Sequence, residues 1–292
     1  MKDWVISTTV VLADGTIVKT RNRPRKSTAG FDLTRLMVGS SGTLGLVTEA
    51  VLKVTAKPEN EQVGVIAFPS THNAVNTVID VVGKGIPLAA IELLDEQSMK
   101  AINEAGATDK EWKEVPTLFV KFSGTKEGVK EQIDVLAALA TKYGRESFET
   151  SGDPANIAAL WSGRKTALFS LIAQKRHPDD KFLSSDVAVP ISRLADIIEE
   201  TKDRIREAGL LGSTLGHVGD GNFHTSILYG KKDKTAAEKI IADVQMRAIE
   251  MEGTITGEHG IGLALRDMLE VELGTNAVDM MRKVIWGPTH EC

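Results

Sequence analysis

The order of its strand-like and helix-like segments constrains the fold of this sequence more than any other feature. Downstream of residue 62, short runs rich in apolar and β-branched residues alternate with longer segments whose apolar residues recur every three or four positions. The pattern predicts strands at 63–68, 88–94, 118–122, 182–189, 213–217 and 223–229, and helices at 71–82, 126–142, 154–173, 190–208 and 235–251. A strand–helix–strand–strand–helix order is typical of an α+β fold, in which a ferredoxin-like antiparallel sheet carries helices on one face.

A polar segment interrupted by proline, at residues 57–61, separates this region from a different amino-terminal pattern. There, strand-like runs at 5–12 and 16–20 on either side of a turn signal predict a β-hairpin. We therefore expect two domains, the first at 1–56 and the second at 62–287.

Composition argues against several classes of protein. The chain has 292 residues, of which 42% are hydrophobic and 26% charged, enough for a sizeable core. The net charge is -5 without a basic run, so we expect no nucleic-acid binding. No apolar run reaches the length of a membrane span, and the first residues do not read as a signal or transit peptide. The single cysteine, Cys292, argues against a disulfide framework and a cysteine-ligated metal.

Two histidines frame a tight glycine-rich turn in the segment GHVGDGNFH, residues 216–224. If the flanking runs pair as a hairpin, His217 and His224 come to the same end of it. Because neutral imidazole is a common ligand of divalent metals, this convergence favours a metal site. The alternative is a polar turn whose histidines meet only water.

A second glycine-framed segment, GTITGEHGIG, covers residues 253–262. Its glycines let the backbone approach other groups closely and leave the side chains of Glu258 and His259 free. Glu258 would complete a set of two histidines and one carboxylate, with His259 beside it as an acid or base. Taken alone, the segment is explained equally well as a connector before a helix at 263–273.

Arg164 lies on the apolar stripe of the helix predicted at 154–173, in line with Leu160 and Leu168. A guanidinium there needs an anion, and a substrate carboxylate fits its fork. A position at the edge of the stripe, or a protein carboxylate as partner, explains it at least as well. Asp186 interrupts an apolar strand, and we interpret it as a buried capping group rather than as a carboxylate behind a metal ligand.

Taken together, these segments resemble the vanillyl-alcohol-oxidase flavoenzymes, in particular the fungal type of their D-lactate dehydrogenase (cytochrome) branch. Residues 10–15, 32–34 and 39–48 resemble the end of the family's FAD-binding domain. Leu160, Trp161 and Arg164, with residues 216–224 and 257–260, resemble its catalytic domain. The resemblance implies the carboxy-terminal part of a PCMH-type FAD-binding domain at 1–56, followed by an FAD-linked oxidase C-terminal domain at 62–287.

The resemblance also implies roles for individual residues. His217, His224 and Glu258 would hold a divalent metal, zinc or manganese, while Arg164 would bind the substrate carboxylate and His259 would be the catalytic base. The loop GSSGTLG lacks the Rossmann spacing and by itself predicts only a turn. By resemblance, its residues Gly39, Ser40, Gly42, Thr43 and Gly45 would lie along the flavin.

The implied reaction oxidises D-lactate, or a similar small D-2-hydroxy acid, to the 2-keto acid. FAD would accept the hydride and cytochrome c the electrons, in mitochondria. Relatives that oxidise 2-hydroxyglutarate have Lys, Asn and Thr where this chain has Ser184, Ser226 and Leu168. Loss of these polar partners disfavours a second substrate carboxylate.

Three departures from the family leave other functions open. The chain begins after the first half of the family's FAD-binding domain, Ser41 stands where the family usually has Glu, and residues 286–292 form an aberrant tail. The alternatives are an inactive metal-binding fragment without flavin, or a D-2-hydroxyglutarate or glycolate dehydrogenase of the same family. A zinc hydrolase using the same three ligands ranks last, because nothing in the sequence supplies its substrate pocket.

Overall fold

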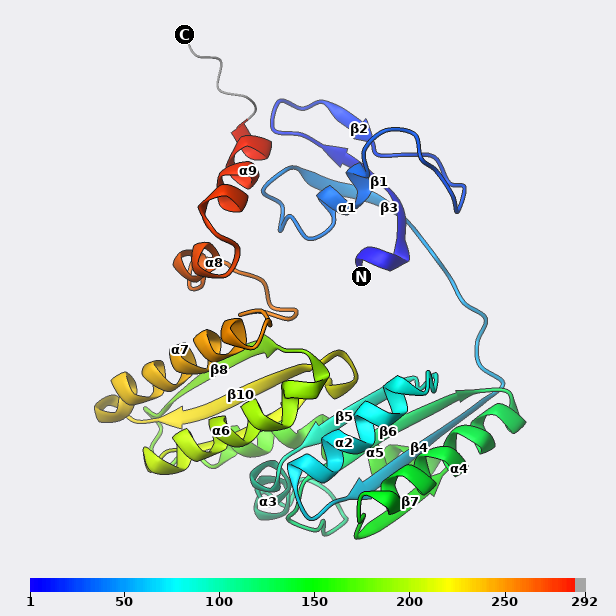
Figure 1. The fold of residues 1–292 in the computed structure, drawn as a ribbon, viewed down its shortest axis with the longest axis vertical. Coiled ribbons are helices and arrows are strands. Elements are labelled where there is room, and N and C mark those ends of the chain that lie inside the picture. Colours follow the sequence, from blue (N-terminus) through cyan, green and yellow to red (C-terminus); the bar gives the residue numbers. More distant parts are fainter. Residues whose placement is uncertain (287–292) are drawn as a thin grey trace. The chain divides into compact units, whose positions relative to one another are not determined.

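The protein is described by a computed structural model that covers residues 1–286 (Figure 1). The chain forms two compact units. The first contains Met1–Lys57 and residues 273–286, and the second contains Pro58–Glu272. Apart from Trp286, the tail set apart by the sequence at 286–292 lies outside the described residues. No helix in residues 1–286 is long and apolar enough to cross a membrane.

The first unit is built on a small antiparallel sheet. Its strands β1 (Val5–Val11), β2 (Ile17–Lys19) and β3 (Leu46–Leu52) lie in the order β2-β1-β3. The short helix α1 (Leu33–Met37) begins after Asp32, whose side chain accepts the backbone N–H of Arg35. Helix α9 (Thr275–Trp286), from the other end of the chain, belongs to this unit.

The second unit contains an antiparallel sheet of seven strands in the order β7-β4-β6-β5-β9-β10-β8. The strands are β4 (Asn60–Ala67), β5 (Ala90–Leu94), β6 (Thr117–Gly124), β7 (Ser147–Ser151), β8 (Lys181–Ala188), β9 (Leu211–Gly216) and β10 (Asn222–Tyr229). The helices are α2 (Thr71–Gly83), α3 (Glu96–Glu104), α4 (Lys126–Lys142), α5 (Pro154–Ala173), α6 (Leu194–Glu207), α7 (Lys234–Glu250) and α8 (Arg266–Leu273).

This sheet consists of two half-sheets with related topology. The order β7-β4-β6-β5 is that of a ferredoxin-like split βαβ motif, and β9-β10-β8 repeats the order of its first three strands. The halves join where β5 pairs with β9, through only two pairs of residues, Leu93 with Gly216 and Leu94 with Leu215. We call this short pairing the seam.

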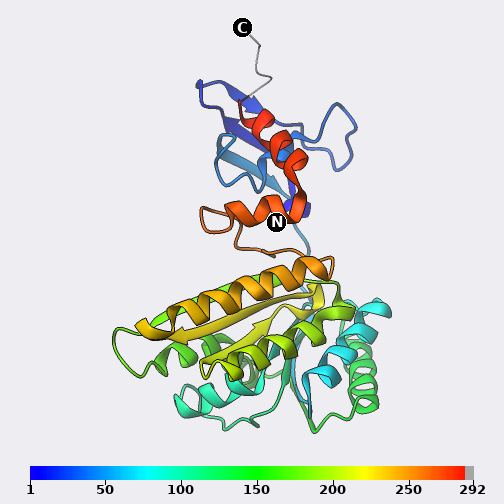
Figure 2. The same cartoon turned by 60° about the vertical axis from the view of Figure 1, so that its left-hand side comes forward.

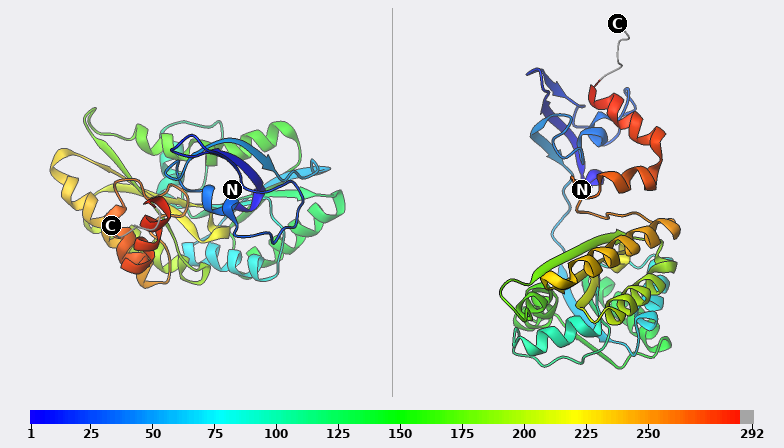
Figure 3. Two further views of the ribbon diagram at one scale, coloured as in Figure 1. Left: turned by 90° about the horizontal axis from the view of Figure 1, so that it is seen from above. Right: turned by 90° about the vertical axis from the view of Figure 1, so that its left-hand side faces the viewer.

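Helices cover both faces of the seven-stranded sheet, so the expectation of helices on one face is wrong. Helices α2, α4, α6 and α7 enclose one hydrophobic cluster, and α3 and α5 enclose another on the opposite face. Within β4, Val63 and Val65 belong to the second cluster and Ile66 to the first. Because both faces are apolar, both must be covered. Helices α6 and α7 pack together over β8 and β10 (Figure 2) (Figure 3).

A buried aspartate reinforces the seam. Asp95 follows β5, is 1% exposed, and accepts the N–H of Ser98 (2.7 Å) as the N-cap of α3. Its other oxygen accepts the N–H (2.6 Å) and the hydroxyl (3.0 Å) of Thr214 on β9. Burial, together with the nearby Glu96, raises the pKa of Asp95 to about 6, against the effect of these hydrogen bonds. One carboxylate therefore ties β5, α3 and β9 together.

We expect Asp95→Ala to lower the free energy of unfolding of the second unit by about 3 kcal/mol, because buried donors lose their acceptor. Asp153→Ala is the matched control: Asp153 also caps a helix, α5, but does so at an exposed position within one element. Its loss should cost about 1 kcal/mol. Urea unfolding measures both, followed by tryptophan fluorescence in a Trp4→Phe and Trp286→Phe background that leaves only Trp112 and Trp161. Equal losses would contradict a special role for Asp95 at the seam.

Candidate metal centre

The polar residues of the sequence motifs gather on the face of the sheet that α3 and α5 cover. On β10, Phe223 and Ile227 pack into the cluster of the opposite face, so His224 points toward α5. By the same alternation, Asp186 next to Val187 on β8 also points there. The β9–β10 hairpin thus positions the first histidine motif at the end of the seam.

The three residues proposed as metal ligands converge. The imidazole rings of His217 and His224 lie 5.5 Å apart between centroids. Oε1 of Glu258 lies 3.4 Å from Nε2 of His217 and 3.2 Å from Nε2 of His224. One ligand atom from each residue lies within 4.8 Å of the others. This arrangement follows from the hairpin and from the loop after α7, which brings Glu258 to it.

The spacing of these atoms suits a divalent metal. With bonds of about 2.1 Å, tetrahedral geometry separates ligand atoms by roughly 3.4 Å, close to both distances. The Nδ1 atom of His217 is hydrogen-bonded to Oε1 of Glu92 at 2.8 Å, so Nε2 is the nitrogen that faces Glu258. A carboxylate behind a ligating histidine is the usual support in protein metal sites. The residues present therefore fit a metal ion.

The two histidines differ in their electrostatics. The hydrogen bond that Glu92 accepts from His217 raises the pKa of His217, against the effect of burial. Burial is the main cause that lowers the pKa of His224, although Asp186 and Glu258 oppose it. The lowered pKa of His224 favours its neutral form, the state in which imidazole binds metals.

Asp186 organises the loop that carries Glu258 and His259. Its Oδ2 atom accepts the backbone N–H groups of both residues, each at 2.7 Å, and the hydroxyl of Thr256 at 2.9 Å. Its Oδ1 atom accepts from the side chain of Asn222 at 2.8 Å. Burial raises the pKa of Asp186, but these hydrogen bonds outweigh it and lower the pKa to about 2. Asp186 is thus a buried cap for a loop, as its sequence context indicates.

His259 lies beside the proposed ligands without being one of them. Its ring stacks on that of His224, with centroids 5.0 Å apart and planes inclined by 15°. Asp186, His224 and His259 also bring ligand atoms within 4.8 Å of one another. We favour the set with Glu258, because Oδ2 of Asp186 already accepts three hydrogen bonds. His259 is 58% exposed at its side chain and is free to meet a substrate.

Arg164 projects from α5 toward the same region. Its Nε atom lies 3.2 Å from Oε2 of Glu92, so a protein carboxylate is one partner, as one reading of the sequence expected. Within residues 1–286, its terminal nitrogens have no hydrogen-bond partner and remain available for a second anion. Sequence reasoning missed Glu92, although a glutamate inside the apolar strand AIELL is a usable signal.

In the first unit, the glycine loop borders a pocket of about 710 Å³. Gly42, Thr43 and Gly45 line it, whereas Gly39 and Ser40 do not. A Cβ on Gly45 would lie 2.7 Å from Cγ1 of Val10, so a larger residue would not fit there. The volume is in the range of ligand sites, and the loop is therefore compatible with a bound cofactor.

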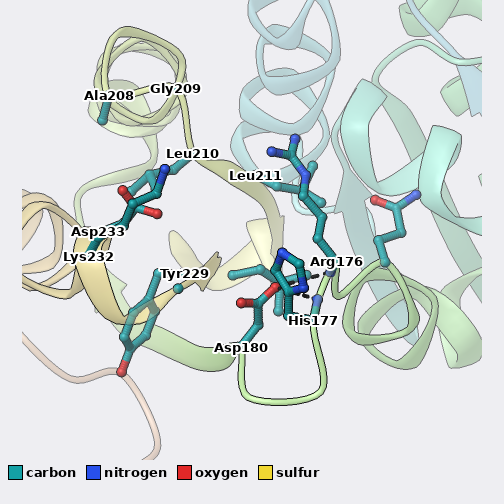
Figure 4. A pocket seen from close by; sticks show the side chains of 13 residues that line it. Arg176, His177, Asp180, Ala208, Gly209, Leu210, Leu211, Tyr229, Lys232 and Asp233 are labelled. Carbon is teal, nitrogen blue, oxygen red and sulfur yellow. Dashed lines mark hydrogen bonds between the residues drawn. The ribbon is translucent and has the colours of Figure 1, made fainter.

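A different pocket, of about 330 Å³, lies at the far end of the β9–β10 hairpin (Figure 4). It lies near Leu211, where β9 begins, and Tyr229, where β10 ends, with Arg176 and His177 beside them. None of the motif residues lines it, so it is distinct from the candidate metal centre.

Residues 57–284 match the family described as FAD linked oxidases, C-terminal domain. The chain belongs to this family. The resemblance drawn from the motifs is thus confirmed at the level of the family.

Several curated proteins resemble this FAD-linked oxidase chain. D-lactate dehydrogenase (cytochrome), mitochondrial, of Kluyveromyces lactis is 45% identical over 97% of this chain and 50% of that protein. The Arabidopsis thaliana protein of the same name is 39% identical over 97% of this chain and 50% of that protein. Glycolate oxidase subunit GlcD of Bacillus subtilis is 33% identical over 96% and 60%. The chain spans about half the length of the first curated relatives it matches.

Solved structures confirm the fold class. 4-Ethylphenol oxidase from Gulosibacter chungangensis matches with a TM-score of 0.69 at 15% identity, over 96% of this chain and 62% of that chain. p-Cresol methylhydroxylase matches with a TM-score of 0.69 at 13% identity, over 97% and 62%. The α+β fold with its antiparallel sheet, predicted from the sequence, is therefore that of the PCMH-type FAD oxidases.

We expect Asp186→Asn to loosen the loop of the metal centre, because an amide cannot accept all the hydrogen bonds that the carboxylate accepts. Hydrogen exchange at the amides of Glu258 and His259 should become at least tenfold faster. Ser185→Ala is the control: this neighbour is buried, and its hydroxyl has no hydrogen-bond partner within residues 1–286.

The effect should also depend on pH. Because the pKa of Asp186 is lowered from 3.8 to about 2, its stabilising contribution is present above pH 4 and is lost as pH falls toward 2. Asp186→Asn should therefore be less stable than the parent by about 2 kcal/mol at pH 5, with a smaller difference near pH 2. Unchanged exchange, or a difference in stability independent of pH, would contradict this role.

Proposed function

We propose that this chain provides the metal and substrate site of an FAD-dependent dehydrogenase that oxidises D-lactate to its 2-keto acid. The observation that carries the proposal is the convergence of His217, His224 and Glu258 next to an arginine with free terminal nitrogens. The relatives named D-lactate dehydrogenase support the substrate. Their names also support a cytochrome as electron acceptor, for which we propose cytochrome c, and a mitochondrial location.

The chain's own residues account for binding and proton transfer. The terminal nitrogens of Arg164 bind the substrate carboxylate as a fork. His217, His224 and Glu258 would hold a divalent metal, which would supply Lewis-acid chemistry that lowers the pKa of the substrate hydroxyl. His259, stacked on His224, takes the hydroxyl proton. FAD, when bound, supplies the acceptor for the hydride from C2.

We assign the loop with Gly39, Ser40, Gly42, Thr43 and Gly45 to flavin binding. Support comes from the pocket that Gly42, Thr43 and Gly45 line, and from the family to which the chain belongs. We likewise keep 1–56 as the end of the FAD-binding domain and 62–287 as the catalytic domain.

The environment of the site favours a small substrate. Ser226 on β10 pairs with Ser184 on β8 and with Ser213 on β9, so a row of three serines crosses the same face as His224. Leu168 on α5 adds apolar surface one turn after Arg164. None of these side chains carries a positive charge for a second carboxylate, which would be costly to bury without a partner. The glycolate oxidase relative is consistent with a small 2-hydroxy acid.

The test joins this chain to the amino-terminal half of the Kluyveromyces lactis relative and checks that FAD binds. Anaerobic reduction of the flavin is then followed with D-lactate and with D-2-hydroxyglutarate. We expect kcat/KM for D-lactate to be at least tenfold higher, since each missing polar partner is worth about 1–3 kcal/mol against the larger acid.

Two variants make the test specific. Arg164→Met should lose reduction by both acids, and Ser184→Lys should shift the preference toward hydroxyglutarate. A higher kcat/KM for hydroxyglutarate in the parent would overturn the substrate. Bound FAD that neither acid reduces would favour the inactive metal-binding alternative.

A further inference from the structure

We infer that Glu92 is a positioning residue that couples the metal centre to the carboxylate-binding arginine. A single buried carboxylate then sets both the affinity for the metal and the affinity for the substrate anion. The inference rests on the proposed function, because it assumes that His217 binds a metal and Arg164 a carboxylate.

Both oxygens of Glu92 are used, and by different partners. The residue is 9% exposed and lies within β5 between Ile91 and Leu93, which face the opposite cluster. Oε1 accepts a hydrogen bond from Nδ1 of His217 at 2.8 Å, and Oε2 accepts one from Nε of Arg164 at 3.2 Å. A buried carboxylate is stable only with such partners, so its position is fixed by both.

For His217, this bond selects the ligand atom. The residue stands at the end of β9, directly before a short 3-10 turn, Val218–Asp220. With Nδ1 held by Glu92, the ring presents Nε2 to Glu258, and its tautomer is fixed. Loss of such a support typically weakens metal binding by about 10–100-fold.

For Arg164, the bond fixes the side chain while leaving the substrate-binding atoms free. Glu92 engages Nε only, so the two terminal nitrogens keep the planar fork that matches a carboxylate. An arginine that is already ordered loses less side-chain entropy when the anion binds. The negative charge of Glu92 also offsets the repulsion between the guanidinium and a divalent cation at His217.

Glu92 also spans the seam between the two half-sheets. Glu92 lies on β5 of the first half, and its partner Arg164 lies on α5. Its other partner, His217, follows β9 of the second half. Its neighbour Leu93 forms one of the two residue pairs of the seam. The carboxylate therefore connects the halves where the backbone pairing is shortest.

The test uses the intact chain and measures binding rather than turnover. Isothermal titration gives the Kd of Zn²⁺, and then the Kd of D-lactate for the Zn²⁺-loaded chain. Glu92→Gln keeps the shape of the side chain. It places an amide N–H₂ group, itself a donor, against one of the two N–H donors, Nδ1 of His217 or Nε of Arg164. We expect it to weaken Zn²⁺ binding by about 10–100-fold and D-lactate binding by about tenfold. Glu92→Asp keeps the charge and should restore part of both.

The matched control is Glu149→Gln, on β7 of the same sheet, where the carboxylate is exposed and pairs with Lys110. It should change each Kd by less than about twofold, because exposed pairs contribute little. Thermal unfolding of each variant checks the fold.

A double-variant cycle separates coupling from general damage. If Glu92 acts on D-lactate through Arg164, then Glu92→Gln should weaken D-lactate binding little further in an Arg164→Met background. Additive losses of D-lactate affinity would overturn the inference. The inference would also fail if Glu92→Gln bound Zn²⁺ with wild-type affinity while His217→Ala had lost Zn²⁺ binding. The proposed function would stand in that case. Retention of Zn²⁺ by His217→Ala would instead contradict the metal centre itself.

Discussion

The second unit depends on the short seam between β5 and β9. Only two residue pairs join the half-sheets there, and the buried carboxylate of Asp95 adds hydrogen bonds to β9. The seam also determines which groups meet at the site, because each half-sheet brings a different kind of side chain to it. Arg164 lies on α5, which packs against β4 and β5 of the first half, and the second half brings the two imidazoles that we propose as metal ligands. Under the proposed function, an anionic substrate that chelates a metal would bind where these groups meet.

Two buried carboxylates position the other residues of the site. Asp186 holds the loop of Glu258 and His259 by its backbone, and Glu92 holds His217 and Arg164 by their side chains. Asp186 accepts four hydrogen bonds and Glu92 accepts two, and such bonds are the condition under which a buried charge is tolerated. The groups proposed to bind metal and substrate are therefore positioned by residues with no proposed contact to either.

Much of this arrangement was predictable from local sequence signals. Helix α5 begins and ends where Asp153, Pro154 and the apolar stripe indicate, and the histidine motif forms the expected hairpin. The pattern missed α3, although Asp95 is a usable capping signal, and it missed β7, an edge strand with Phe148 as its only large apolar residue. Edge strands need fewer apolar side chains because less of their surface is buried.

Other features were not predictable because they depend on contacts between distant residues. Glu92 and His217 are 125 positions apart, and nothing in either segment indicates the other. The related topology of the half-sheets lies in their strand order and not in a repeated sequence. We propose that His217, His224 and Glu258 bind one divalent ion, and X-ray absorption spectroscopy of the Zn²⁺-loaded chain measures the ligands of that ion. We expect two imidazoles per zinc, with N and O ligands at about 2.0–2.2 Å and no sulfur. One imidazole or none would show that the three residues do not form the metal site.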